Sequence, residues 1–251
     1  ISPIDAYEPS YAFESAGPFT AEHLDVHSEI REAAIQDRIR FGERWAVLLG
    51  LRYTDFETDS LDILGGVPAP SRFSGSDTSS QFGLVYDLND SVSLFANRNE
   101  AFVPRNELDV NNRPFEPEQS KQTEIGVKFD VGDSGLSGNA AFFRIEKPNV
   151  LAIAPNDPSA RVPIGAVEVQ GVELSVQGRL APHWSLYAGY AFLDSEMKNE
   201  SDFNAAGAEF GNTPKHSFSL ISNYELQGGP LDGLELNLAY QFSGKRWSDT
   251  G

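Results

Sequence analysis

The sequence predicts an all-β protein, an antiparallel transmembrane β-barrel of which this chain supplies about ten strands. Five pairs of long alternating segments open near residues 30, 77, 119, 167 and 214, a spacing of about 42 to 48 residues. A tight turn joins the two segments of each pair, and long polar stretches separate one pair from the next. Short turns that alternate with long loops are the layout of an up-and-down barrel in an outer membrane.

The alternation is clearest in residues 45–53. Side chains of a strand point to opposite faces in turn, which puts on one face Trp45, Val47, Leu49, Leu51 and Tyr53. The opposite face carries Ala46, Leu48, Gly50 and Arg52 and is not apolar throughout. Such segments run for roughly 10 to 13 residues, whereas soluble strands usually have about five or six and membrane strands about 9 to 11. Strand length therefore favours a membrane barrel over a soluble sandwich.

The same criteria place each element along the chain. Residues 1–29, with three prolines and an acidic stretch, are expected to be an irregular incoming strand end and loop, and residues 30–251 to be barrel. Strands are expected at 30–41, 45–57, 77–88, 91–102, 119–130, 136–147, 167–180, 184–196, 214–227 and 233–246. These ranges combine period-two alternation with flanking turn residues.

The connections are expected to be of two kinds. Short turns are expected at 42–44, 89–90, 132–135, 181–183 and 228–230, where Gly, Asn and Pro supply the special φ values of turns. Long loops, rich in Pro, Gly, Asp and Asn, are expected at 58–76, 103–118, 148–166 and 197–213. Long loops of outer-membrane barrels lie outside the cell, so ligand recognition is expected there.

Aromatic residues stand where two membrane interfaces would lie. Trp45 and Trp184 each follow a short turn, and Tyr53 and Tyr190 come six to eight residues later in the same strands. At about 3.3 Å per residue and a tilt near 40°, eight residues climb roughly 20 Å, close to the height of a lipid-facing band. The aromatic pattern therefore predicts a girdle at each interface.

Composition excludes several classes of protein. No apolar run approaches the roughly 18 residues that a membrane-spanning helix needs. The chain has no Cys, which excludes disulfides, thiolate metal sites and a Cys nucleophile. A net charge of −18 argues against nucleic acid as a partner, because phosphate binding needs a basic surface. The first residues lack the basic and apolar regions of a signal peptide, which is expected to be absent or removed.

Six motifs stand in a fixed order along the chain. The most extended is Pro117–Lys128, which reads PE-x-S-x-x-x-E-x-G-x-K. The others are Gln36–Phe41 with Trp45 and Gly50–Tyr53, then Asn149-Val150, Gly171–Leu174, Asn212–Leu220 and Gly244–Arg246. Each motif alone is weak, but together, in this order and over nearly the whole chain from about residue 30, they resemble the TonB-dependent siderophore receptors.

The resemblance implies an outer-membrane importer of a Gram-negative bacterium, with no catalytic chemistry and no cofactor. Such receptors have a 22-stranded barrel filled by an N-terminal plug, bind a ferric siderophore at extracellular loops, and take energy from TonB. The chain is accordingly expected to be a fragment of the middle and later barrel, without the plug. Expected partners are the siderophore, TonB-ExbB-ExbD through the plug region, and outer-membrane lipid or lipopolysaccharide.

Four residues flank one expected loop and are candidates for ligand binding. Phe102, Arg105, Arg113 and Phe115 lie around the predicted loop 103–118. Aromatic faces and guanidinium groups suit an anionic or aromatic chelate. The alternative is that the Phe pair belongs to an aromatic girdle and the Arg pair is surface charge.

Four charged residues are expected to face the lumen. Arg52, Glu124, Lys128 and Glu173 fall on the non-lipid face of segments that match the family. An Arg or Lys that faced lipid at the midplane would cost about 2–4 kcal/mol, so an inward orientation is expected. These residues are interpreted as wall or plug contacts.

Metal ligands are not expected, because a siderophore delivers iron already wrapped. His23 and His27 have the i, i+4 spacing of a helical metal site, but the stretch has little helical support. The acidic run Asp55, Glu57, Asp59 and Asp62 lacks the glycine and terminal glutamate of a calcium loop. Both are interpreted as solvated loop residues.

Other classes fit part of the pattern. A β-propeller has a similar period, but each blade needs four short strands where this chain offers two long ones. An omptin-like outer-membrane protease has ten strands, but no convincing Asp-His pair stands in the predicted loops. A passive porin would be distinguished by the lack of a plug, and a TonB-dependent importer of cobalamin or sugar by its ligand.

Overall fold

The computed structural model describes residues 23–64, 67–105, 115–132, 135–154, 157–198 and 206–247. The chain divides into two compact units. One comprises residues up to 30 together with 56–74, and the other comprises 31–55 together with 75–251.

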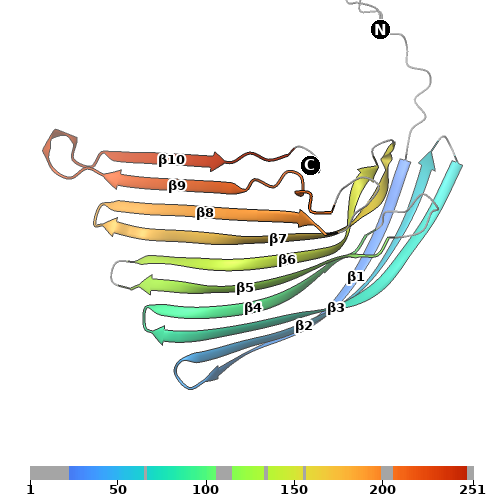
Figure 1. The fold of residues 1–251 in the computed structure, drawn as a ribbon, viewed down its shortest axis with the longest axis horizontal. Helices are drawn as coiled ribbons and strands as arrows, with labels where there is room; N and C mark the ends of the chain where they lie inside the picture. Colours follow the sequence, from blue (N-terminus) through green and yellow to red (C-terminus); the bar gives the residue numbers. More distant parts are fainter. Residues whose placement is uncertain are drawn as a thin grey trace, which may run out of the picture. The chain divides into compact units, whose positions relative to one another are not determined.

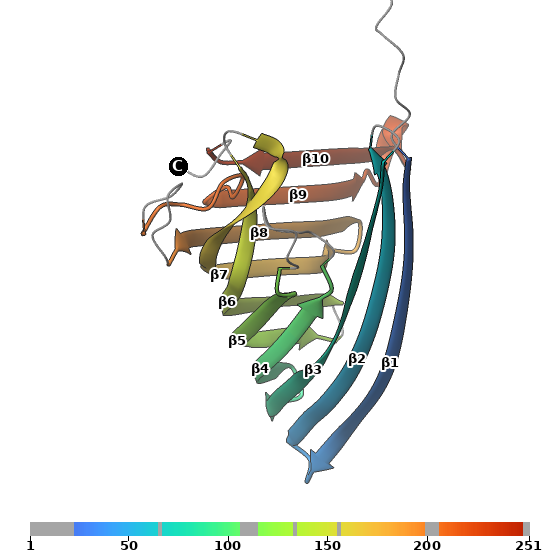
Figure 2. The same ribbon diagram turned by 90° about the vertical axis from the view of Figure 1, so that its right-hand side faces the viewer.

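Ten strands form one sheet whose order follows the chain from β1 to β10 (Figures 1 and 2). The strands are β1 (His23–Phe41), β2 (Trp45–Leu64), β3 (Val67–Asn89), β4 (Val92–Val103), β5 (Glu118–Val131), β6 (Leu136–Ala154), β7 (Asp157–Ala181), β8 (Trp184–Met197), β9 (His216–Glu225) and β10 (Glu235–Ser243). Every predicted strand is present, and the all-β antiparallel architecture is confirmed. No helix within the described ranges has the length and apolarity to cross a membrane.

The turns between β1 and β2, β3 and β4, and β7 and β8 lie where the turn chemistry predicts them, whereas the connection between β9 and β10 is longer than predicted and contains a 3₁₀-helix at Gly229–Leu231. Gly42 opens the β1–β2 turn with a φ of 60°, a conformation that side chains other than Gly rarely adopt. At the β3–β4 turn the Asn89 side chain accepts a hydrogen bond from the backbone N–H of Ser91 at 2.9 Å. An Asn side chain that bonds two residues ahead mimics a backbone turn.

Five strands are longer than predicted. β2 and β3 extend into the predicted loop 58–76, and β6 and β7 into 148–166, while β1 begins at His23. The β6–β7 ladder breaks between Lys147 and Val150 and then resumes. Asn149, at φ 60°, lies within this break. A bulge lets the β6–β7 ladder continue through a stretch that contains Pro and Gly. The content of these residues alone therefore predicts a loop where the structure has a strand.

The smaller unit has its own polar contacts. Ser28 and Thr58 share a hydrogen bond of 3.1 Å between their hydroxyl groups. Arg72 forms an ion pair with Glu57 and approaches Asp59 at 3.7 Å. The acidic run that the sequence singled out is thus partly neutralised by an arginine.

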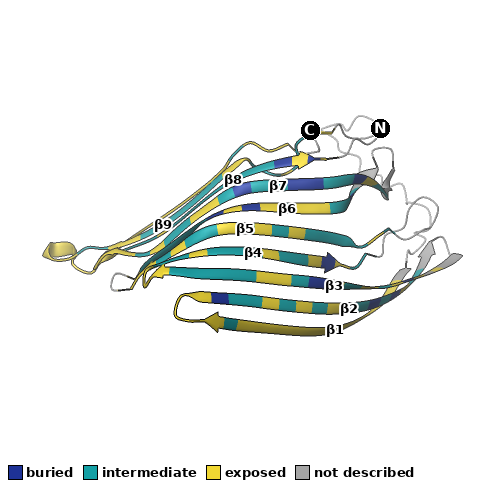
Figure 3. Cartoon of the chain, turned by 60° about the horizontal axis from the view of Figure 1, so that its bottom comes forward, coloured by how far each residue is buried: buried dark blue, intermediate teal, exposed yellow. Residues whose placement is uncertain are grey.

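The larger unit presents an apolar face. Paired residues of adjacent strands share a face, so the register defines a row across β3 to β8 of Leu84, Ala96, Ile125, Phe142, Val172 and Phe192. Ile125 and Phe142 are 56% and 47% exposed, although both are large and apolar. Figure 3 shows how little of each strand is buried. Exposed apolar rows of this extent are what a lipid-facing surface requires.

The opposite face carries more polar side chains, and a small apolar core lies at one end of it. Val150, Ile164, Val167 and Met197 pack together there. Phe210, from the segment after β8, packs against this cluster. The Phe210 backbone N–H donates to the Ser195 hydroxyl at 3.1 Å, which holds the segment against β8.

Candidate functional site

The polar face holds Glu124 within an amide network. The Asn97 side chain donates to a Glu124 carboxylate oxygen at 3.2 Å, and Gln122 donates to the same oxygen at 3.4 Å. Asn99 in turn donates to the Asn97 side-chain oxygen at 3.2 Å. The Asn99 side-chain oxygen is buried without a partner among the described residues. The carboxylate is therefore held in place by groups of its own wall.

Glu173 lies two strands away on the same face. The register pairs Glu124 with Phe143 on β6, and pairs Ala141 of β6 with Glu173 on β7. Phe143 and Ala141 are each 5% exposed. Two carboxylates thus flank a closely packed apolar strip on an otherwise polar wall.

The geometry explains why the motif has Gly126 between Glu124 and Lys128. A Cβ on Gly126 would stand 2.6 Å from the Phe95 ring and 2.4 Å from the Ala140 carbonyl oxygen. The ring of Phe95 therefore covers the glycine. The Lys128 ammonium lies 5.0 Å from the centre of that ring, a cation–π distance.

Arg52 lies on the second strand, on the same side as Glu32. Its guanidinium is 3.9 Å from a Glu32 carboxylate oxygen, which also accepts a 3.0 Å hydrogen bond from Thr54. These three side chains form a local group apart from the Glu124 network. The four predicted wall residues therefore lie among different neighbours.

The predicted rim residues fall in different environments. Phe102 is buried at the end of β4, and Phe115 is half-buried just before β5. The Arg105 side chain is 9% exposed and bonds to Glu118 at 2.7 Å. Arg113 lies outside the described residues. The Arg105 hydrogen bond, followed by that from Lys147, holds the pKa of Glu118 below its usual range, against an opposing effect of burial.

The apolar face gives way to charge towards the long connections. Two residues beyond the apolar row lies a row of Arg98, Thr123, Arg144, Gln170 and Asp194. The next row is Glu100, Lys121, Glu146, Glu168 and Glu196. These two polar rows mark the point where a lipid-facing surface must end, because charge is costly in hydrocarbon.

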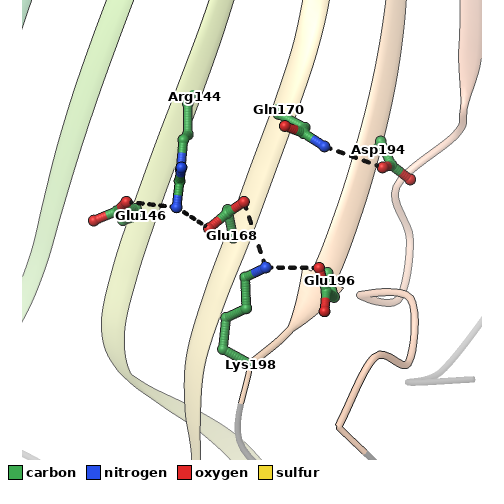
Figure 4. A network of polar contacts seen from close by, with 7 residues as sticks. All are labelled: Arg144, Glu146, Glu168, Gln170, Asp194, Glu196 and Lys198. Atoms are coloured by element: carbon green, nitrogen blue, oxygen red, sulfur yellow. Dashed lines mark hydrogen bonds and ion pairs between the residues drawn. The ribbon is translucent and has the colours of Figure 1, made fainter.

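Three carboxylates of the outer polar row stand directly opposite one another. Glu146, Glu168 and Glu196 are paired across β6, β7 and β8. Arg144 lies between the first two, at 3.1 Å from Glu146 and 2.6 Å from Glu168. Lys198 joins the other two, at 3.5 Å from Glu168 and 2.6 Å from Glu196 (Figure 4). Two cations thus offset the repulsion that facing like charges would cause.

Sequence reasoning missed this network and the partners of Arg105. The in-register facing of Glu146, Glu168 and Glu196 depends on strand register, which an alternating pattern does not specify across hairpins. Glu118 stands within the family-like segment Pro117–Lys128, so the motif could have drawn attention to it. No group of three His, Asp or Glu side chains in the described ranges could hold a metal ion.

Comparison with known proteins identifies the class. Residues 3–251 match the family model described as TonB dependent receptor-like, beta-barrel. The chain therefore belongs to the β-barrel family of TonB-dependent receptors. Members of this family lie in the outer membrane of Gram-negative bacteria and are transporters, not enzymes. The apolar face is accordingly the lipid-facing face, and the polar face lines the barrel interior.

Individual relatives fall among siderophore and metallophore receptors. The chain is 33% identical to the metal-pseudopaline receptor CntO of Pseudomonas aeruginosa strain UCBPP-PA14, over 98% of this chain and 35% of that protein. It is 27% identical to the ferrioxamine B receptor of Salmonella typhimurium strain LT2, over 96% of this chain and 34% of that protein. The chain thus spans about a third of the length of these relatives.

Solved structures show the same fold. The siderophore receptor PiuA from Acinetobacter baumannii superimposes with a TM-score of 0.77 at 23% identity, over 90% of this chain and 35% of that one. The ferric yersiniabactin receptor FyuA from Yersinia pestis gives 0.73 at 20% identity, over 90% and 36%. The ten strands therefore match part of a larger receptor barrel.

Proposed function

We propose that this chain is part of the barrel of a receptor that binds a ferric siderophore at its extracellular loops and imports it with energy from TonB. The observation that carries the proposal is the similarity along nearly the whole chain to receptors named for chelates. The metal-pseudopaline relative, at 33% identity, favours a metal chelate other than a ferric siderophore as the second candidate.

The proposed ligand site lies around the ends of β4 and β5. Phe102, Arg105, Arg113 and Phe115 are the side chains assigned to this rim. Phe115 is the more accessible of the two aromatics, since Phe102 is 7% exposed. We assign Phe115 and Arg113 to direct contact with the chelate, and the buried Phe102 to packing at the end of β4.

The interior wall is proposed to contact the plug. Glu124 and Glu173 present carboxylates to the lumen, where main-chain N–H groups or cationic side chains of a plug would meet them. The unpartnered oxygen of Asn99 supports this assignment, because a buried acceptor without a donor is costly. Lys128 and Arg52 are assigned to the same wall.

The two polar rows are proposed to lie at the headgroup level of the outer leaflet. Arg98 and Arg144 stand in the row nearer the membrane, where lipopolysaccharide phosphates would lie. Guanidinium groups bind phosphate oxygens in a bidentate manner. The carboxylates of the next row lie farther out, with Lys121 and Lys198 among them.

The proposed function is tested on the full-length receptor that contains this barrel. Cells that express it would be given iron-loaded ferrioxamine B, iron-loaded ferrichrome and metal-loaded pseudopaline, with and without functional TonB. We expect saturable binding of at least one chelate in both strains, and uptake only where TonB is active. Uptake that persists without TonB, or binding of none of the three, would contradict the proposal.

A further inference from the structure

Side chains connect β5 to β6 where their backbone pairing ends. The β5–β6 ladder reaches Lys121 opposite Glu146, although both strands continue. Beyond that point the Lys147 ammonium lies 3.1 Å from a Glu118 carboxylate oxygen. The Asn149 amide donates to a Glu116 carboxylate oxygen at 2.9 Å. The two strands therefore remain tied by polar side chains after the ladder stops.

Arg105 stands at the centre of this tie. One guanidinium nitrogen donates to the Asn149 carbonyl oxygen at 2.6 Å, and another donates to Glu118 at 2.7 Å. Asn149 lies where the β6–β7 register breaks, at φ 60°. A planar guanidinium that donates in two directions fixes the relative position of both acceptors.

The position of Arg105 argues against direct contact with a chelate. Its side chain is 9% exposed, and two of its nitrogens already donate to protein oxygens. A chelate that displaced these bonds would leave the Glu118 carboxylate with Lys147 alone. Such an exchange replaces one charged contact with another, so it adds little to the binding free energy of the chelate.

We propose that Arg105 is a positioning residue. It joins the end of β4, the start of β5 and the bend of β6 into one rigid body at the extracellular end of the barrel. The described ends of β4, β5 and β6 then present the side chains that they carry to a chelate in a fixed arrangement. The role in recognition rests on the proposed function, whereas the mechanical tie does not.

The mechanical tie is tested by distance measurement, which needs no ligand. Because the chain has no Cys, spin labels can be attached at Val103→Cys and Pro163→Cys of the full-length receptor. Both positions are exposed. We expect a narrow distribution of label distances that broadens in Arg105→Ala and also in the milder Glu118→Gln. Arg98→Ala, an arginine of the same strand, serves as the control.

An unchanged distribution in both Arg105→Ala and Glu118→Gln would overturn the tie. Broadening in Arg98→Ala of the same size would overturn the special role of Arg105. Because Glu118→Gln keeps the shape of the side chain, its label distances alone test the tie if the Arg105→Ala receptor fails to reach the membrane.

The role in recognition is tested by binding of iron-loaded ferrioxamine B, iron-loaded ferrichrome and metal-loaded pseudopaline. If Arg105 positions the rim, Arg105→Ala and Glu118→Ala each weaken binding about tenfold, since the order of the joined strand ends must then be regained on binding. The double variant is no weaker than either single variant. If instead Glu118→Ala binds as tightly as wild type or more tightly, Arg105 contacts the chelate and the positioning role fails. Failure of the wild type to bind any chelate would reject the proposed function, while the label distances still decide the tie.

Discussion

At the scale of the residue, what a charged side chain does depends on its register. Arg105, Arg144 and Lys128 are all cations near strand ends or walls. The first is nearly buried between two acceptors, the second separates two carboxylates, and the third lies over an aromatic ring. Sequence identifies the residue types, but only the pairing of strands assigns these partners.

The lowered pKa of Glu118 makes the Arg105 tie sensitive to acid. Its pKa is lower in the folded chain than in the unfolded chain, so its stabilising effect is complete above the unfolded pKa and is lost as pH falls through the folded pKa. We expect the distribution of label distances between 103 and 163 to stay narrow at neutral pH and to broaden only in acid, once the pH has fallen below the ordinary pKa of a Glu side chain. Glu118→Gln should show no such pH dependence. Broadening already between pH 7 and pH 6 would contradict this assignment.

Arg144 is expected to stabilise the sheet by separating Glu146 from Glu168. Arg144→Ala should lower the free energy of unfolding by about 1 kcal/mol, a value discounted because the Arg144 side chain is half exposed. Adding Glu168→Gln should recover part of the loss, since one of the facing carboxylates is then neutral. Thermal unfolding in detergent, followed by the heat-dependent shift of the barrel on gels, measures both. Arg179→Ala, at the opposite end of β7, is the control, and equal losses there would refute the specific role.

At the scale of the element, glycine and phenylalanine act as pairs. Gly126 lies beneath Phe95, Gly138 beneath Phe129 and Gly171 beneath Phe143, with hypothetical Cβ positions 2.6 to 2.8 Å from a ring carbon. A large ring on one strand thus fills the space that a glycine leaves on its neighbour. Aromatic coverage of strand glycines is a recognised means of fixing register.

Gly126→Ala is expected to disrupt this packing. The added methyl group would collide with the Phe95 ring and with the Ala140 backbone, at a cost of roughly 1–3 kcal/mol in the free energy of unfolding. Gly132→Ala is the matched control, because nothing lies within 4 Å of its Cβ position. Equal unfolding midpoints for the two variants would show that Phe95 moves aside freely.

The strand count, strand order and short turns could be predicted because each depends on local signals. Alternation identifies a strand such as 45–57, the first part of β2, and Gly42 or Asn89 identifies the turn. The extensions of β2, β3, β6 and β7 could not be predicted, since their Pro and Gly content suggested loops. In β6 and β7 the ladder continues past a break in register, which no local pattern shows. The contacts of Arg105 join residues 44 and 13 positions apart, a relation that no local pattern contains.

At the scale of the whole molecule, the apolar face determines that the chain needs lipid or detergent around it rather than water alone. On β10, Leu236, Leu238, Tyr240 and Phe242 are 46–58% exposed. Within the described part of the sheet, β10 pairs with β9 alone. An apolar face beside an open strand edge is prone to association in water.

The 251-residue segment is therefore expected to aggregate when it is expressed alone and refolded without detergent. Detergent micelles should cover the apolar face and keep the segment dispersed, with a β-sheet signal in circular dichroism. Analytical ultracentrifugation with and without detergent checks this expectation. A monodisperse species in detergent-free buffer would show that the apolar rows are covered by the chain itself.

The strand order also determines how the sheet can be assembled. Because every strand from β2 to β9 has its chain neighbours as partners, the sheet can grow by one hairpin at a time. Each hairpin closes through a short connection, which costs little chain entropy. The carboxylates of the Glu146–Glu168–Glu196 row are offset as the row forms, because Arg144 is already on β6 when β7 brings Glu168, and Lys198 directly follows β8, which brings Glu196. A sheet of this strand order can thus extend by local pairing, and its charged row is balanced as each strand is added.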